Sequence, residues 1–151
     1  METSALSGLE YELTLLSRHF LAARQHRGGQ KLDRSAYLIL TRLAAQEPMS
    51  LKELAEAFAL DVSTLNRQVA ALRRNGLVER VADPYGGVAR KFRATTEGLT
   101  QLAADRAQGH SNLGMVVADW SDGEVAALFG LVAKFNESIE KLENNPWPRK
   151  H

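Results

Sequence analysis

The sequence predicts a mainly α-helical fold with a small antiparallel β-wing, and three observations support this prediction. Apolar residues recur every three or four positions along most of the 151 residues, the spacing that gives a helix one buried face. Residues 77–95 break this pattern with two short strand-like runs around a glycine-rich turn. The content of 44% hydrophobic and 25% charged residues is ordinary for a globular chain, so we expect one domain over residues 1–151.

The composition argues against several classes of protein. No apolar run approaches the roughly 18 residues that span a membrane. The N-terminal METSALSGLEYE lacks the features of a secretory signal, so we expect a cytoplasmic location. Without cysteine there is no disulfide, thiolate zinc site or cysteine redox sensor. The four histidines lack ligand spacing, and there is no phosphate loop or nucleophile elbow, so we expect no metal, no cofactor and no enzymatic activity.

Two helices are expected before residue 48. Ser7 is placed to cap the first helix, which should end near Gly28. Asp33 is placed to cap the second helix, which should stop before Pro48 because proline cannot continue a helix. The apolar residues that recur at helical spacing are Leu9, Leu13, Leu16 and Phe20 in the first helix, and the second helix carries Ala36, Leu40 and Leu43.

Two shorter helices joined by a tight connection follow. Ser50 and Glu53 have the spacing of a capping box at the start of the third helix. The fourth helix should begin near Asp61 or Ser63 and stop at Gly76, which readily takes a left-handed conformation. The residues expected on their buried faces are Leu51, Leu54, Ala55 and Phe58 in the third helix, and Val62, Leu65, Val69 and Leu72 in the fourth.

Strands are expected over residues 77–81 and 91–95, on either side of a turn at residues 83–87. Two short helices, a glycine stop and a β-hairpin in this order form a winged helix-turn-helix, a motif that places one helix in the major groove of DNA. We therefore assign residues 33–95 to a DNA-binding lobe.

The charge distribution is consistent with this lobe. Residues 61–93 hold seven Lys or Arg and three acidic residues, a local net charge of +4, whereas the rest of the chain carries −3. A basic segment on an otherwise acidic body suits a polyanion surface. The alternative is a solvated loop and helix face, and charge alone does not separate the two.

The outer helices form the remaining part of the fold. A fifth helix should run from Thr96 towards Trp120, and Ser121 with Glu124 forms a second capping box before the last helix. Residues 144–151 are expected to fray. The first and last helices are apolar enough to need a partner surface, so residues 5–28 and 97–144 are assigned to dimerisation. The alternative is that they cover the lobe of their own chain. The apolar stripe of the last helix comprises Val125, Leu128, Phe129, Val132, Phe135, Ile139 and Leu142.

Several motifs occur in a characteristic order along this frame. They are the run Ser63-Thr64-Leu65-Asn66-Arg67, then Leu72, Gly76-Leu77-Val78 and Arg80, the pair Thr95 and Gly98, and Trp120-Ser121. Together they resemble the MarR (multiple antibiotic resistance regulator) family of bacterial winged helix-turn-helix transcription factors, with Ala94 in place of a usual Leu. The resemblance covers nearly the whole chain. It implies a homodimeric regulator, most often a repressor, that binds double-stranded DNA at a pseudo-palindromic operator.

The wing departs from the family pattern. Where the family commonly has Asp-Arg-Arg, with an Arg that reaches the minor groove, this chain has Gly86, Gly87 and Val88. Basic residues follow later, at Arg90 and Lys91. Three interpretations stay open. In the first, Arg90 and Lys91 contact phosphate from the strand. In the second, Tyr85 and the glycine tip act differently, and in the third minor-groove readout is lost.

The DNA contacts expected of the fourth helix follow from its residue types. Its N-terminal amides, with the hydroxyls of Ser63 and Thr64, would meet a phosphate. Arg67 suits bidentate contact with guanine, and Asn66 or Gln68 suits adenine. The residues expected to contact backbone phosphates are Arg73, Arg74, Arg90 and Lys91. The alternatives are a solvated charge for Arg67, and for Arg73 and Arg74 a favourable interaction with the C-terminus of their own helix.

The resemblance also implies a small aromatic or anionic effector, bound between the dimerisation helices and the DNA-binding lobe. Tyr11, His19 and Tyr37 are the expected lining groups, with a role in the core or an interface as the alternative. A winged helix used for protein–protein contact is the second function that stays open. Its contact face would be acidic or apolar, whereas the face expected here is basic with small polar residues.

Overall fold

The computed structural model describes residues 3–23, 31–46, 48–82, 85–86 and 90–149, and every structural statement below concerns these residues. The helices are α1 (Thr3–Ala23), α2 (Arg34–Ala45), α3 (Leu51–Phe58), α4 (Val62–Arg74), α5 (Thr96–Val116) and α6 (Asp122–Glu143). The strands are β1 (Met49–Ser50), β2 (Val78–Val81) and β3 (Lys91–Ala94). This arrangement confirms a mainly α-helical fold with a small antiparallel wing. None of these helices is long and apolar enough to span a membrane.

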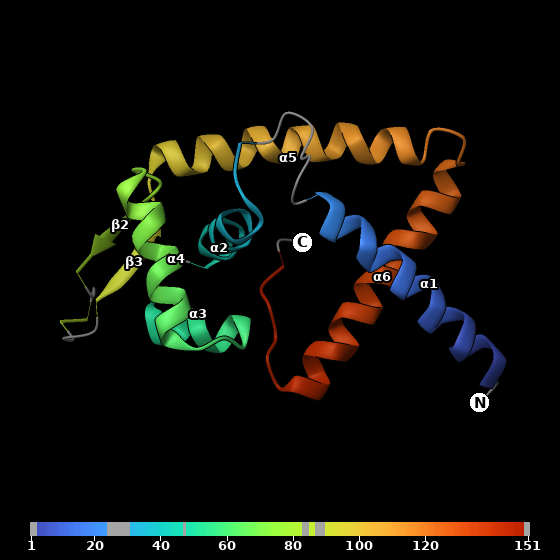
Figure 1. Ribbon diagram of the computed structural model, residues 1–151, viewed down its shortest axis with the longest axis horizontal. Helices are drawn as coiled ribbons and strands as arrows, with labels where there is room; N and C mark the ends of the chain where they lie inside the picture. The colour runs from blue at the N-terminus through green and yellow to red at the C-terminus, as the bar shows by residue number, and fades with distance from the viewer. Residues whose placement is uncertain (1–2, 24–30, 47, 83–84, 87–89, 150–151) are drawn as a thin grey trace.

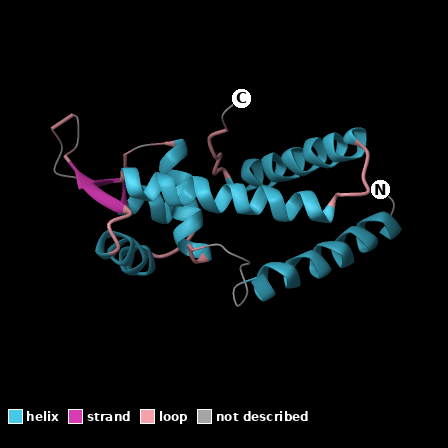
Figure 2. Cartoon of the chain, turned by 90° about the horizontal axis from the view of Figure 1, so that it is seen from above, coloured by secondary structure: helices cyan, strands magenta, loops and turns pink. Residues whose placement is uncertain are grey.

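The elements separate into a lobe and an extended helical part. The elements from α2 to β3 form the lobe at one end of the molecule, with the wing projecting outwards (Figure 1). From there α5 runs the length of the molecule, and α6 returns from its far end towards α3. Seen from above, α1 and α6 lie on opposite sides of α5 (Figure 2), so α1 does not pack along α6 within one chain.

The hydrophobic core lies inside the lobe. Leu40, Leu43, Leu54 and Leu65 are fully buried, and they come from α2, α3 and α4. Leu102 adds the first turns of α5 to the same cluster. These helices therefore bury most of the apolar side chains that the sequence places on their inner faces, and the remaining face of α4 is left outside.

The caps predicted from local spacing are confirmed. The Asp33 carboxylate accepts the Ala36 amide at 2.8 Å. The capping boxes at Ser50 and Ser121, with Glu53 and Glu124, are both complete. Each cap satisfies amides that the helix itself leaves without partners, which is why these boundaries are readable from the sequence.

Three local predictions are wrong. Ser7 does not cap the first helix, because α1 begins at Thr3 and the Ser7 hydroxyl donates to the Thr3 carbonyl from inside the helix. Val62 is 48% exposed because it is the first residue of α4 and lies outside the buried stretch. Residues 144–149 are not frayed, since Trp147 packs against the core of the lobe. The predicted end of the first helix at Gly28 falls outside the described residues.

The sheet has a strand that the sequence did not indicate. Its order is β1-β3-β2, and both pairings are antiparallel. Met49 pairs with Phe92, and both side chains are buried. A strand of two residues shows no alternation, so only its long-range partner reveals it.

Gly98 sits at the junction between the wing and α5. The Thr95 hydroxyl accepts the Gly98 amide at 3.0 Å and donates to the Gly76 carbonyl at 2.6 Å. A Cβ on Gly98 would overlap the Leu77 carbonyl oxygen and would lie 3.3 Å from Leu40 Cδ2. Glycine is therefore required here by close approach of two backbones, and this contact joins α5 to the lobe.

Candidate nucleic-acid interface

Helix α4 has one buried and one exposed face. Leu65, Val69 and Leu72 are at most 3% exposed and hold the helix against the lobe. The opposite face carries the predicted DNA contacts. Ser63, Asn66, Arg67, Arg73 and Arg74 are exposed, whereas Thr64 and Gln68 are half-buried. The structure thus places most of these predicted residues on the outward surface of α4, with Gln68 on the flank beside α2 and Arg73 on the flank beside the wing.

The N-terminus of α4 already carries a carboxylate. Asp61 Oδ1 accepts the Thr64 amide and the Ser63 hydroxyl, both at 2.7 Å. The hydrogen bond from Ser63, followed by those from Thr64, lowers the pKa of Asp61 to about 2. The single hydroxyl proton of Ser63 is therefore engaged with Asp61. A phosphate at this helix end would compete with the Asp61 carboxylate.

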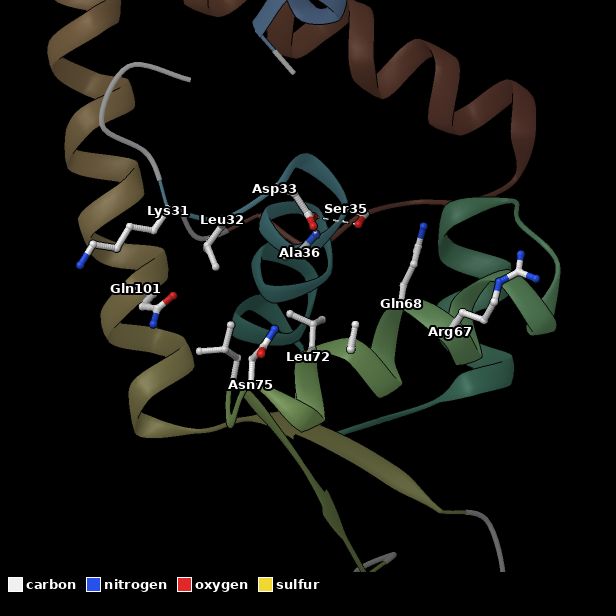
Figure 3. A pocket seen from close by; sticks show the side chains of 12 residues that line it. Lys31, Leu32, Asp33, Ser35, Ala36, Arg67, Gln68, Leu72, Asn75 and Gln101 are labelled. Carbon is white, nitrogen blue, oxygen red and sulfur yellow. Dashed lines mark hydrogen bonds between the residues drawn. The ribbon is translucent and has the colours of Figure 1, made fainter. Parts of the chain in front are cut away.

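Arg67 and Gln68 stand beside a pocket of about 550 Å³. The pocket lies between α4, the start of α2 and α5 (Figure 3). Lys31 and Gln101 line its far side. A molecule held there would touch the two α4 side chains that were predicted to read bases.

Three arginines gather at the base of the wing, and we call Arg73, Arg80 and Arg90 the wing-base cluster. Arg73 and Arg80 hold their guanidinium carbons 5.9 and 5.8 Å from the Phe92 ring, within cation–π range. Desolvation first, and then repulsion by Arg73 and Arg90, lowers the pKa of Arg80. Among the described residues no carboxylate forms an ion pair with any of the three. Within the described part of the chain, the cluster therefore carries positive charge that no ion pair offsets.

Arg80 was not among the predicted contacts. Arg80 pairs with the buried Phe92 across the sheet, but its own side chain is exposed, and its neighbour Arg73 comes from the end of α4. Alternation along the strand puts Arg80 on the same face as the buried Val78, so it does not predict the exposure of this arginine. Its proximity to Arg73 and Arg90 depends on folding and could not be read from the sequence.

Two basic side chains of the wing are paired with acids. Lys91 Nζ lies 3.5 Å from a Glu53 carboxylate oxygen, and Arg93 Nε lies 2.6 Å from Glu79. Attraction to Lys91 contributes to the lowered pKa of Glu53, after its hydrogen bonds with Ser50. The charge of Lys91 is therefore partly compensated, whereas Arg90 has no acidic partner among the residues that the structure describes.

The wing tip is described only in part. Tyr85 is 94% exposed, and Gly86 has a φ of 75°, which favours glycine. Gly87 and Val88, where the family pattern has arginines, lie outside the described residues.

The predicted effector residues are not gathered in one pocket. Tyr11 is 60% exposed on α1, and His19 is exposed on the same helix. Tyr37 is half-buried on α2 and packs against the core. None of the three lines the pocket beside α4, the pockets at the end of α6 or the groove on α1.

A winged helix-turn-helix that presents a basic helix face, followed by two long helices, defines a class of transcriptional regulators. The MarR family model matches residues 32–85. The chain is also 37% identical over 133 residues to the uncharacterised HTH-type transcriptional regulator YxaD of Bacillus subtilis, over 87% of this chain and 92% of that protein. The chain therefore belongs to the MarR family, a family of transcriptional regulators and not of enzymes.

Solved structures agree with this assignment. A MarR family protein from Bacillus stearothermophilus superimposes with a TM-score of 0.81 at 21% identity, over 92% of this chain and 98% of that one. The PcaV transcriptional regulator from Streptomyces coelicolor, in complex with its natural ligand, gives a TM-score of 0.61 at 25% identity, over 86% and 92%. The resemblance inferred from the sequence motifs and the fold class are both confirmed.

Proposed function

We propose that this protein represses transcription by binding double-stranded DNA, as a homodimer, at a pseudo-palindromic operator. The observation that carries the proposal is the exposed face of α4 beside the wing-base cluster. Arginines that have no acidic partner among the described residues attract a polyanion. A helix that is held by its apolar face can present its other face to the major groove.

The proposed contacts are of two kinds: contacts with bases, which read the DNA sequence, and contacts with phosphates, which anchor the protein on the DNA. Arg67 donates to guanine, and Asn66 or Gln68 contacts adenine. Ser63 and Thr64 take a phosphate at the start of α4, where Asp61 yields one or both of its hydrogen bonds. The anchoring residues, which contact phosphate without reading sequence, are Arg73, Arg74, Arg80, Arg90 and Lys91.

Within the wing, we assign the main phosphate contacts to Arg80 and Arg90. Both lack a carboxylate partner among the described residues, so contact with DNA costs them no ion pair. Lys91 would first have to loosen its ion pair with Glu53. Of the three interpretations of the wing, these observations favour phosphate contact from the strand.

The exposed apolar face of α6 supports a homodimer. No residue of α6 is buried within the single chain, although its side chains include Phe129, Phe135 and Ile139. Apolar surface on this scale is normally covered by a partner. A second copy would cover it and would present two α4 helices to DNA about one helical turn apart.

We further propose that a small anionic or aromatic effector controls DNA binding. The structural neighbour PcaV was solved with its natural ligand. In this chain Lys31 and Arg67 line opposite ends of the pocket beside α4 (Figure 3), and each is a cation that can bind an anion. Such a ligand acts only through different affinities for the DNA-bound and DNA-free states. A role for Tyr11, His19 and Tyr37 in effector binding stays a prediction.

A gel-shift experiment separates this proposal from a winged helix used for protein–protein contact. The protein is titrated against random duplex DNA at low salt, and then against duplexes selected from a random pool. We expect salt-sensitive binding to the random duplex and tighter binding to a selected palindrome. The absence of any shift at low salt would favour the protein-contact function.

A further inference from the structure

The chain beyond α6 turns back and contacts the DNA-binding lobe. We call residues 144–149 the strap. Asn144 has a φ of 51° and ends α6, and the Asn145 amide then donates to the Glu140 carbonyl at 2.9 Å. This left-handed stop redirects the chain towards α3. Figure 1 shows the strap returning from the end of α6.

The strap completes the C-terminal cap of α3. That helix stops with Ala59 at a φ of 52°, where the amides of Ala59 and Leu60 bond to the carbonyls of Glu56 and Ala55. The Ala57 carbonyl has no helical partner in this arrangement. It accepts from Asn145 Nδ2 at 3.0 Å and from Trp147 Nε1 at 3.1 Å.

The Trp147 ring adds apolar contact to this cap. It meets the Phe58 ring edge to face, with the ring centres 5.1 Å apart, and the Arg42 guanidinium lies 5.0 Å from its centre. An indole that is held by its N–H, a ring edge and a cation has one preferred position. The contacts of Trp147 therefore fix the strap to α2 as well as α3.

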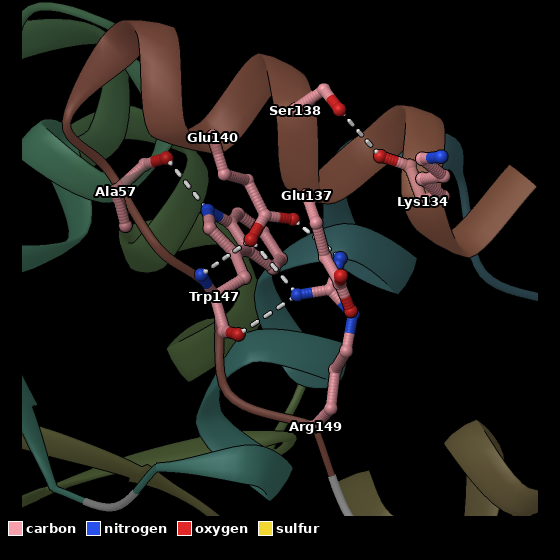
Figure 4. A network of polar contacts seen from close by, with 7 residues as sticks. All are labelled: Ala57, Lys134, Glu137, Ser138, Glu140, Trp147 and Arg149. Carbon is pink, nitrogen blue, oxygen red and sulfur yellow. Dashed lines mark hydrogen bonds and ion pairs between the residues drawn. The ribbon is translucent and has the colours of Figure 1, made fainter.

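A carboxylate on α6 fixes the other side of the strap. Glu140 accepts two hydrogen bonds from Arg149, at 2.6 and 2.8 Å, and the Trp147 amide at 3.1 Å (Figure 4). The hydrogen bonds from Arg149 are the main cause that lowers the pKa of Glu140 to about 2. The strap is thus tied to α6 at Glu140 and to the lobe at Ala57.

The closed strap also includes an unfavourable contribution to its free energy, from the buried side chain of Arg42. Arg42 is 6% exposed, and its Nε and Nη1 atoms have no hydrogen-bond partner among the described residues. Burial lowers the pKa of Arg42, and attraction to Glu140 opposes this only in part. Buried donors without partners oppose closure, so they favour release of the strap.

We propose that residues 144–149 form a releasable strap that fixes the turn between α3 and α4 to the C-terminal end of α6. That turn is made by Ala59 and Leu60 and directly precedes the Asp61 cap of α4. When the strap is closed, α4 keeps one orientation relative to the dimerisation helix. Any consequence of this orientation for DNA binding rests on the proposed function, whereas closure of the strap does not.

Tryptophan fluorescence tests whether the strap closes. Trp120→Phe leaves Trp147 as the sole tryptophan, whose emission is excited selectively over that of the three tyrosines. Arg149→Ala then removes the tie to Glu140. We expect Arg149→Ala to raise the acrylamide quenching constant of Trp147 at least about twofold, because the docked ring is shielded. Lys134 is exposed on α6, the helix that carries Glu140, and Lys134→Ala should leave the quenching constant unchanged. Equal quenching in all three proteins would overturn the proposal.

Amide hydrogen exchange tests whether the strap holds the turn. Arg149→Ala should accelerate exchange at Ala59 and Leu60 by about tenfold, since a charged hydrogen bond stabilises by roughly that factor. Lys134→Ala should not. Raised quenching without faster exchange would mean that the strap closes but does not fix the turn, which also contradicts the proposal. Neither readout involves DNA, so their failure is distinguishable from failure of the proposed function.

Discussion

Gly98→Ala tests the junction between the wing and α5. The new methyl group would overlap the Leu77 carbonyl oxygen, and it would lie 3.0 Å from the Leu77 carbonyl carbon. Both atoms belong to the backbone, and the Leu77 carbonyl also accepts the Thr95 amide at 3.0 Å. Relief therefore requires α5 to move away from β2, which disturbs that hydrogen bond as well.

The expected cost is about 3 kcal/mol in the free energy of unfolding, the upper end of the usual range for overpacking. For a chain of this size, each kcal/mol shifts the melting temperature by roughly 2–4 °C, so Gly98→Ala should lower it by about 6–12 °C. Differential scanning calorimetry at one fixed protein concentration measures this shift.

Gly76 provides the matched control. Its φ of 72° disfavours a side chain, but a Cβ there would meet nothing within 4 Å. Gly76→Ala should therefore cost only about 1–2 kcal/mol, the conformational term alone. Asn tolerates the left-handed region, so Gly76→Asn should recover part of that loss, whereas Gly98→Asn should not. Equal melting temperatures for Gly98→Ala and the parent protein would refute the close approach at Leu77.

Three further predictions concern α3, the strap and α6. Ala59→Gly should stabilise the protein by about 0.5–1 kcal/mol in chemical denaturation, since the relief of about 1–2 kcal/mol of left-handed strain exceeds the entropic cost of about 0.4–1 kcal/mol for ordering glycine. Because the pKa of Glu140 falls from 4.5 to about 2, the strap should be closed above pH 4.5 and open as the pH falls towards 2. Trp147 quenching measured against pH should show this, and Glu140→Gln should abolish the transition. Leu128→Glu on α6 should convert a dimer into monomers in light scattering, and an unchanged mass would remove α6 from the interface.

Local signals explain what the sequence predicted correctly. The caps at Asp33, Ser50 and Ser121 depend on residues three positions apart, so their geometry is contained in a short window. The buried face of α4 follows from spacing in the same way. The face of α4 that carries Arg67 could therefore be assigned before the structure was known.

Long-range contacts explain what the sequence did not predict. The two residues of β1 become a strand only through their pairing with β3. The strap was expected to fray because nothing near Trp147 in the sequence indicates its contact with Ala57. At the interface, the pairing of Lys91 with Glu53 and the approach of Arg80 to Arg73 likewise join segments that are separate in sequence.

The salt dependence of DNA binding tests most directly whether the wing-base cluster contacts phosphate. Fluorescence anisotropy gives the affinity of the parent protein, Arg80→Ala and Arg106→Ala for one labelled random duplex over a range of salt concentrations. Arg106 is exposed on α5, away from the cluster. We predict that Arg80→Ala weakens binding and reduces the log–log salt slope by about 0.9, the value for one lost phosphate contact. Arg106→Ala should match the parent protein. An identical slope for all three proteins, or no binding at low salt, would contradict the proposed interface.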